Sequence, residues 1–298
     1  YLTDYFQLKL IVTGSSSFYL KNLFSESLSG RKNVFELFPL DFGEFLIFKE
    51  VQAVPWVKTL AELVSLKTRM IILRYQPLLE EYLLTGGFPQ AVLADKNSDK
   101  GKLLRDILDS YVQIDVKTLS DFKSLDNLEK TVFLLPPRVG QKFDFSKISK
   151  ELNLSRITLK SYLRFLQETY VAFLLYPFSK SPDREISSRP KLYFCDNGLA
   201  LALGQLGQGQ LLENYVYNSL CSHFSLIYYQ RKSGTEIDFI IDKQIGVEVK
   251  VFGNNRDLSR LKRMEKTLGL NSSFLISQKL GEESPRETLP AFLLGFLN

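Results

Sequence analysis

The sequence predicts an α/β protein of several domains, and three observations support this prediction. The chain has 298 residues, which is long enough for two or three domains with their own cores. Strand and helix patterns alternate over residues 8–46, as is typical of a parallel sheet. The C-terminal part carries a β-hairpin pattern that is followed by a helix and a further strand. We therefore expect α/β units at both ends of the chain.

The composition is that of an ordinary globular protein. Hydrophobic residues make up 45% and charged residues 24%. No apolar run approaches the ~18 residues that a membrane span requires, and the start of the chain has no signal-peptide pattern. Two cysteines, Cys195 and Cys221, are too few for a disulfide framework or a zinc site. A single histidine argues against histidine-based catalysis. We expect a cytoplasmic protein with no membrane partner.

Residues 1–55 are predicted to form the back part of an α/β core. Leu8–Thr13 and Asn33–Phe38 have strand patterns, with a helical pattern between them. Asp41 is placed to cap a further helix. So short a segment cannot complete a sheet, and the chain does not begin with methionine. We therefore expect the numbered chain to be the later part of a longer protein.

Residues 56–135 are predicted to be helical. Leu78–Leu84 is amphipathic and stops at Thr85–Pro89, where glycines and then a proline end a helix. Lys102–Asp115 carries leucine, isoleucine and tyrosine at the i, i+3, i+4, i+7 spacing of a buried stripe. We interpret Gly86-Gly87 as a simple helix end.

Residues 136–196 have the pattern of a winged helix-turn-helix. Two helices, Phe145–Leu152 and Arg156–Glu168, are separated by a short turn. Strand patterns follow at Val171–Phe178 and Lys191–Phe194, with a polar loop between them.

This segment is also basic, with eleven Lys and Arg against five Asp and Glu between residues 138 and 191. The second helix of such a motif commonly enters the major groove of DNA. A winged helix that packs against another protein is the alternative. The candidate DNA contacts are Arg156, Thr158, Lys160 and Arg164 on the second helix, Arg184 in the wing loop, and Arg231 just before the C-terminal hairpin.

Residues 197–298 contain the most informative stretch. Two apolar runs, Ile237–Ile241 and Ile245–Val251, flank a polar turn and predict a hairpin. Asp238 lies within the first strand, and Glu248 and Lys250 share one face of the second. Burying such charges without partners is costly. Mg²⁺ could compensate them, because one or two carboxylates with waters commonly hold it. The alternative is the solvent-facing side of an edge hairpin.

The spacing of Asp238 and Glu248-Val249-Lys250 resembles the Asp…Glu-x-Lys signature of the restriction-endonuclease-like fold. In that family an acidic residue on the preceding helix completes the site, and here Glu213, in the first turn of a predicted helix, matches it. The resemblance implies an α/β/α domain with Glu213, Asp238 and Glu248 as metal ligands. It also implies that these residues, with Lys250 as the catalytic lysine, hydrolyse phosphodiesters with Mg²⁺.

The N-terminal segment carries a second resemblance. Val12–Ser16, Gly30-Arg31 and Phe38–Phe45 resemble the back half of an AAA-type ATPase core. The similar group is a prokaryotic ATPase family that ends in a domain of unknown function related to restriction endonucleases. The resemblance implies that residues 56–135 form a helical lid. It also implies nucleotide-sensing roles for Thr13, Ser15, Ser16 and Arg31.

The ATP-binding elements of that family lie upstream of this segment. No Gly-x-x-x-x-Gly-Lys-Ser/Thr motif occurs in the sequence. We therefore expect ATP binding only in the longer, intact protein, and none by the numbered chain alone.

These observations predict the C-terminal portion of an ATP-dependent AAA-type protein that acts on nucleic acid and has a Mg²⁺-dependent nuclease site. The alternative is a non-enzymatic DNA- or protein-binding regulator with a degenerate nuclease-like domain. A third hypothesis is an ATPase that remodels a protein partner. The expected partners are DNA, a protein and further copies of the chain.

Overall fold

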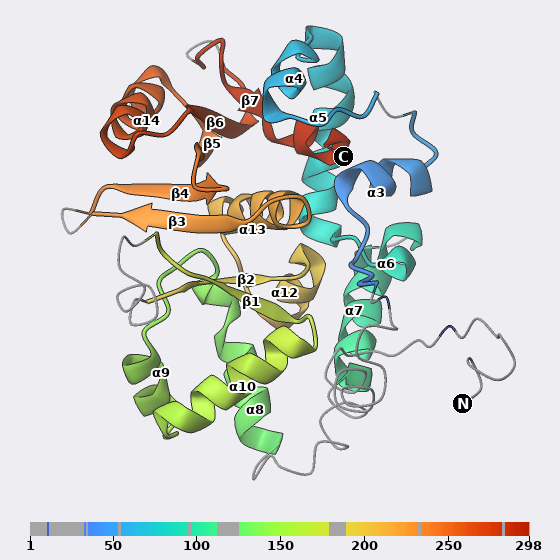
Figure 1. The fold of residues 1–298 in the computed structure, drawn as a ribbon. Helices are drawn as coiled ribbons and strands as arrows, with labels where there is room; N and C mark the ends of the chain where they lie inside the picture. The colour runs from blue at the N-terminus through green and yellow to red at the C-terminus, as the bar shows by residue number, and fades with distance from the viewer. Residues whose placement is uncertain are drawn as a thin grey trace, which may run out of the picture.

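A computed structural model describes residues 11, 33, 35–52, 55–94, 97–111, 125–178, 189–231, 234–281 and 284–297. The predicted strand at Leu8–Thr13, the helix after it and the candidate residues Thr13, Ser15, Ser16, Arg31 and Arg184 lie outside this part of the chain. The described part is a mixed α/β structure with a two-stranded and a five-stranded sheet (Figure 1).

The first described helix, α3 (Phe42–Phe48), begins where the sequence predicts. The Asp41 carboxylate accepts the backbone N–H of Glu44 at 2.7 Å, and the Glu44 carboxylate accepts the backbone N–H of Asp41 at 3.0 Å. This reciprocal capping box satisfies two backbone donors that the helix cannot satisfy itself. Burial raises the pKa of Asp41 to about 6, against the opposing effect of the backbone hydrogen bond from Glu44.

The strand prediction for Asn33–Phe38 is wrong over residues 35–38. These residues form no strand, and the side chains of Phe35 and Leu37 are exposed. A strand needs a hydrogen-bonded neighbour for its backbone groups, and no described strand pairs with this segment.

Helix α3 and Val57 instead pack against the C-terminal end of the chain. Helix α3 contacts the 3-10 helix η3 (Ala291–Phe296). Any side chain on Gly43 would overlap the carbonyl oxygen of Gly295. Val57 donates its backbone N–H to the Phe296 carbonyl at 2.9 Å. The apolar C-terminal segment at residues 289–297 is therefore a buried part of the core.

The helical prediction for residues 56–135 is confirmed for most of the described residues from Leu60 onwards. The helices are α4 (Leu60–Ser65), α5 (Arg69–Thr85), α6 (Pro89–Leu93), α7 (Asn97–Tyr111) and α8 (Leu125–Leu134), followed by the 3-10 helix η2 (Pro136–Arg138). Helix α5 ends at Gly86, which has a φ of 76°, a conformation that favours glycine.

Gly86-Gly87 does more than end a helix, which corrects the simpler interpretation. Gly87 donates its backbone N–H to the Asp196 carboxylate at 2.7 Å, across 109 positions in the sequence. Asp196 also caps helix α12 (Asn197–Leu203) by accepting the Leu199 N–H at 2.8 Å. Burial raises the pKa of Asp196 to about 6, although these backbone donors oppose the shift. The hydrogen bonds that Gly87 and Leu199 donate to Asp196 thus join the end of α5 to the start of α12.

Next come two helices and a two-stranded antiparallel sheet, in the predicted order. They are α9 (Phe145–Glu151), α10 (Arg156–Glu168), β1 (Ala172–Leu175) and β2 (Lys191–Phe194). Strand β1 is shorter than predicted. The residues after it pair with the larger sheet, because Phe178 donates its N–H to the Tyr228 carbonyl at 2.6 Å.

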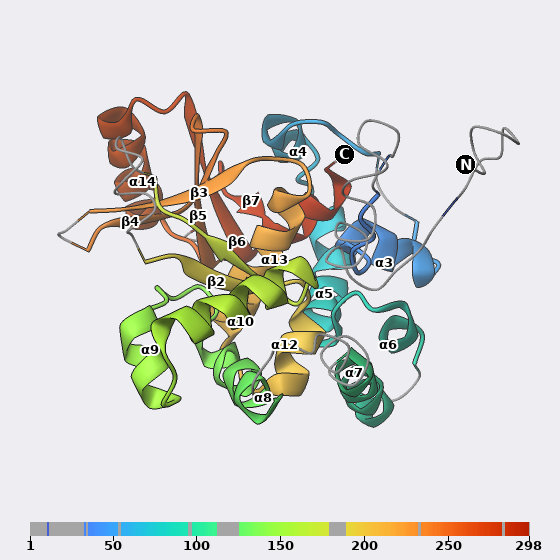
Figure 2. The ribbon, with the colours of Figure 1, turned by 60° about the horizontal axis from the view of Figure 1, so that its bottom comes forward.

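The larger sheet follows helix α13 (Gln208–Cys221). Its strands are β3 (Leu226–Gln230), β4 (Glu236–Ile241), β5 (Ile245–Phe252), β6 (Ser272–Lys279) and β7 (Leu289–Pro290), in that spatial order. The predicted hairpin is confirmed as β4–β5, which pair antiparallel. Helix α14 (Asn255–Leu268) connects β5 to β6, which run parallel. Helices α13 and α14 lie on opposite faces of this sheet (Figure 2).

Strand β3 and the start of α13 differ from the sequence prediction. Strand β3 was not predicted, although Leu226–Gln230 is an apolar and aromatic run. Helix α13 begins at Gln208, so Glu213 lies in its second turn rather than the first. The side chain of Gln210 accepts the Gly207 N–H at 2.9 Å and fixes this earlier start.

Strand β4 contains a bulge at Asp238 and Phe239. Tyr229 pairs with Ile237 and Ile227 pairs with Ile240, so two residues of β4 stand opposite one residue of β3. A bulge can re-aim a side chain relative to strict alternation. Ile237 packs in the cluster beside α14, whereas Phe239 packs in the main core. The bulge thereby allows Asp238 and Phe239 to lie on the same face.

Within the described ranges, no helix has both the length and the apolar character needed to cross a membrane.

Candidate functional site

The carboxylates that the sequence singles out lie around the β4–β5 hairpin, with Glu213 and Asp238 on the α13 face of the larger sheet and Glu248 on the α14 face. Asp238 lies on the β4 bulge, Glu248 on β5 and Glu213 on α13. The charge of Asp238 acts on both glutamates. Asp238 Oδ2 accepts the backbone N–H of Val249 at 2.8 Å, which joins β4 to β5 at this point.

A lysine that the sequence analysis did not predict lies among these carboxylates. The Lys191 side chain, on β2, is only 3% exposed. Its Nζ lies 3.0 Å from Glu213 Oε1 and 3.6 Å from Asp238 Oδ1, and it also forms an ion pair with Glu236. The ammonium further lies 5.5 Å from the centroid of the Tyr228 ring. The Lys191 ammonium thus forms ion pairs with three carboxylates.

Glu213 is enclosed by further contacts from residues 140 and 193. The Tyr193 hydroxyl donates to Glu213 Oε1 at 2.8 Å. Gly140 has a φ of 70°, and a Cβ at this position would lie 2.7 Å from Glu213 Oε2. A glycine is therefore required both by the backbone conformation and by the close approach of the carboxylate.

Glu248 has separate cationic partners. Lys250 Nζ lies 2.7 Å from Glu248 Oε1, and Arg260 of α14 binds the same oxygen. The shared face that the sequence predicts for Glu248 and Lys250 is therefore confirmed. The Glu248 side chain is only 4% exposed, so its charge depends on these two partners.

Burial and mutual repulsion shift the ionisation of the acidic groups. Burial, with the charge of Asp238, raises the pKa of Glu213 to about 7 and that of Glu248 to about 7. Burial alone would lower the pKa of Lys191, but the charges of Glu213, Asp238 and Glu236 raise it above its ordinary value. The ammonium therefore stays charged where a carboxylate can take up a proton.

The side chains in this arrangement do not fit a Mg²⁺ ion. Across the described ranges, no group of three or more His, Cys, Asp or Glu side chains is arranged to hold a metal. Lys191 faces Glu213 and Asp238, and two more cations hold Glu248. Mg²⁺ requires nearly octahedral oxygen ligation, and these oxygens already serve protein donors.

The candidate DNA-contacting residues of α10 differ in exposure. Arg156, Lys160 and Arg164 are exposed, whereas Thr158 is partly buried and shares a 2.8 Å hydrogen bond with the helix-capping Ser155. Ile157, beside Arg156, is also exposed. The three basic side chains contact Ser146, the Phe145 ring and Glu168 respectively.

Arg231 lies apart from α10 in the sequence and in the fold. It follows β3 directly and begins the turn that connects β3 to β4, where its backbone N–H donates to the Thr235 carbonyl at 2.8 Å. Arg231 is exposed.

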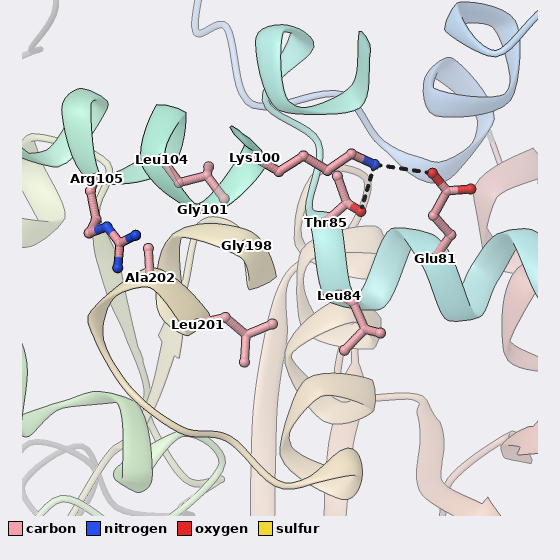
Figure 3. A pocket seen from close by; sticks show the side chains of 10 residues that line it. All are labelled: Glu81, Leu84, Thr85, Lys100, Gly101, Leu104, Arg105, Gly198, Leu201 and Ala202. Carbon is pink, nitrogen blue, oxygen red and sulfur yellow. Dashed lines mark hydrogen bonds and ion pairs between the residues drawn. The ribbon is translucent and has the colours of Figure 1, made fainter. Parts of the chain in front are cut away.

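A separate cavity of 510 Å³ lies between α5, α7 and α12 (Figure 3). Lys100 is buried at its edge, with Nζ 3.3 Å from Glu81 Oε1 and 3.5 Å from Thr85 Oγ1. Glu81 also pairs with Lys49 at 3.0 Å. The Lys100 charge is thus matched within the protein, and none of the candidate site residues predicted from the sequence lines this cavity.

Sequence reasoning missed Lys191, Glu236 and Tyr193 as members of the site. A lysine at the start of a strand and a glutamate at a hairpin edge look like ordinary solvent-facing residues. The available signal was alternation, because Glu236 and Asp238 are two apart on one strand. Nothing in the sequence indicated that Lys191 would reach them.

Comparisons with known proteins match different parts of the chain. An AAA domain model matches residues 1–46. A domain of unknown function, DUF8612, matches residues 76–210, and another, DUF4143, matches residues 208–290. No solved structure is a significant match.

The chain is also similar to curated proteins. An uncharacterized protein of Methanocaldococcus jannaschii is 29% identical over 260 residues, which are 84% of this chain and 54% of that protein. An uncharacterized protein of Haemophilus influenzae is 28% identical over 80% of this chain and 57% of its own length. The chain thus spans about half the length of these relatives. The AAA-domain and DUF4143 matches together support an AAA-type family for this chain.

Proposed function

We propose that the described part of the chain is a DNA-binding accessory region of an ATP-dependent AAA-type protein. The observation that carries this proposal is the exposed basic face of α10. Arg156, Lys160 and Arg164 are spaced four residues apart and remain exposed, and this spacing aligns them along one face of a helix.

The opposite face of α10 fixes the helix to the protein. Leu159, Tyr162, Leu163 and Leu166 are buried there. Helix α9 precedes α10 and the β1–β2 sheet follows it, which is the order of a winged helix-turn-helix. In that motif the second helix presents basic side chains to phosphates, so a rigidly held α10 is suited to contact DNA.

The ATP-dependent part of the proposal rests on the AAA-domain match at residues 1–46. ATP binding and hydrolysis would belong to the intact protein, as the missing phosphate-binding motif implies. The intact protein would then couple ATP turnover to its action on the DNA that the accessory region binds.

The nuclease hypothesis remains a second candidate, and one observation favours it. The order α13-β3-β4-β5-α14-β6 is the one that the endonuclease-like resemblance implies, and the charge of Asp238 acts on Glu213, Glu248 and Lys250. The poor fit of Mg²⁺ to the paired carboxylates makes it the weaker candidate. It fails if purified protein does not cleave DNA or RNA with Mg²⁺ or Mn²⁺ present.

DNA binding can be tested by fluorescence anisotropy with a labelled duplex. The combined Arg156→Ala and Lys160→Ala variant is expected to bind more weakly. Its plot of log affinity against log salt concentration is expected to be shallower by about two, because each lost phosphate contact reduces the slope by about 0.9.

The matched control removes two positive charges elsewhere. Lys58→Ala with Arg69→Ala changes exposed residues beside α4 and α5, at the far end of the molecule from α10 (Figure 1). The proposal is wrong if the α10 variant binds DNA as tightly as the parent, or if the control loses as much affinity. Retained DNA binding with a lost protein contact would favour the regulator that packs through α10.

A further inference from the structure

We infer that the ammonium of Lys191 is the resident cation of the carboxylate site and occupies it in place of a divalent metal ion. The inference goes beyond the proposed DNA binding and does not depend on it. Its basis is the position of Lys191 Nζ, which lies within ion-pair distance of Glu213, Glu236 and Asp238.

Neighbouring backbone segments on both sides of β2 hold this lysine in place. Lys191 pairs with Leu175 of β1 on one side and with Lys142 on the other. Phe143 donates its N–H to the Pro190 carbonyl at 2.7 Å, and Gly140 donates to the Leu192 carbonyl at 2.9 Å. The ammonium can therefore leave the site only if its buried side chain changes conformation or β2 moves.

Each of the three carboxylates also accepts a hydrogen bond from another protein donor. Tyr193 donates to Glu213 at 2.8 Å, the Gln230 side chain donates to Glu236 at 3.0 Å, and the Val249 backbone donates to Asp238 at 2.8 Å. A metal ion would have to displace these donors together with Lys191. Hydrogen-bonded carboxylates are satisfied without a metal.

The charges are also close to balance without a metal. Four carboxylates, Glu213, Glu236, Asp238 and Glu248, face the three cations Lys191, Lys250 and Arg260. A divalent ion would turn a small negative excess into a positive one. Removing the charge of Lys191 would instead leave three carboxylates with an unmatched negative charge, which would favour a divalent cation.

The ion pairs of Lys191 connect two parts of the fold. Lys191 belongs to the β1–β2 sheet that follows α10, whereas its partners lie on α13 and β4. The Tyr193 ring, from the same strand, stacks on Tyr217 of α13 at 4.3 Å between centroids. The carboxylate site therefore anchors the helix-and-wing segment to the larger sheet.

Isothermal titration calorimetry with MnCl₂ tests the inference on the full chain. The parent and the exposed-lysine control Lys147→Gln are expected to bind Mn²⁺ at the site only weakly. Lys191→Gln is expected to bind one Mn²⁺ at least about tenfold more tightly than the parent. Adding Asp238→Asn to Lys191→Gln is expected to abolish that binding.

Two results would overturn the inference. Tight Mn²⁺ binding by the parent that disappears in Asp238→Asn would show that the metal and not Lys191 is the resident cation. Absence of binding in both the parent and Lys191→Gln would show that Lys191 excludes no metal. Circular dichroism checks that Lys191→Gln is folded, and Lys191→Met, which keeps the volume of the side chain, is the second variant.

Discussion

Replacing Lys191 by methionine is expected to lower the free energy of unfolding by about 3–5 kcal/mol, which is the usual result of removing one member of a buried ion pair. The methionine keeps the apolar stem of the side chain but leaves Glu213, Glu236 and Asp238 without their shared cation. Urea unfolding of the parent and the variant measures the difference.

The exposed pair of Lys147 and Glu151 supplies a matched control. Its Nζ–Oε1 distance is 4.0 Å, and the Lys147 side chain is 74% exposed. Lys147→Met is therefore expected to cost less than about 1 kcal/mol. Lys191 would have no special role in stability if its replacement cost no more than that of Lys147.

A second change isolates the interaction with Glu213. Glu213→Gln in the Lys191→Met background removes one of the carboxylates that the variant leaves without a cation. The double variant is expected to recover part of the lost stability, because a neutral amide is less costly to bury than an uncompensated charge. A double variant that is less stable by the sum of the two single losses would contradict a direct interaction.

Gly87→Ala is expected to destabilise the protein by about 3 kcal/mol, at the upper end of the usual cost of overpacking. The new Cβ would overlap the carbonyl oxygen of Leu40, which is backbone and also accepts the Tyr82 hydroxyl at 2.7 Å. Gly87 itself cannot shift freely, because its N–H donates to the Asp196 carboxylate and its carbonyl accepts the Leu40 N–H.

Gly209→Ala is the matched control for this effect. Gly209 lies within α13, and a Cβ there would meet no atom within 4 Å. Alanine is favoured over glycine inside a helix, so the control is expected to stabilise the protein by up to about 1 kcal/mol. Urea unfolding compares both variants with the parent. Equal stability of the two variants would contradict the close packing at Gly87.

Local patterns in the sequence predicted local structure well. The apolar runs on either side of Asp242–Gln244 predicted the β4–β5 hairpin. Asp41 predicted the start of α3 because capping depends on neighbours three residues away. The glycines after Thr85 likewise predicted the end of α5.

The site depended on contacts that local patterns do not encode. Lys191 and Glu213 are separated by 22 positions, and only the packing of β2 against α13 brings them together. The bulge that aims Asp238 arises from the pairing of β4 with β3, a strand that the sequence analysis did not predict. The exposed segment at residues 35–38 lacks a described pairing strand, so its apolar pattern misled the strand prediction.

Anomalous diffraction from crystals grown with MnCl₂ tests the role of Lys191 most directly. The expected result is no manganese peak among Glu213, Asp238 and Glu248, with Lys191 Nζ still within ion-pair distance of Glu213 and Asp238. A manganese peak bound by Asp238 and Glu248, with Lys191 displaced, would contradict the account and restore the metal-dependent nuclease as the leading hypothesis.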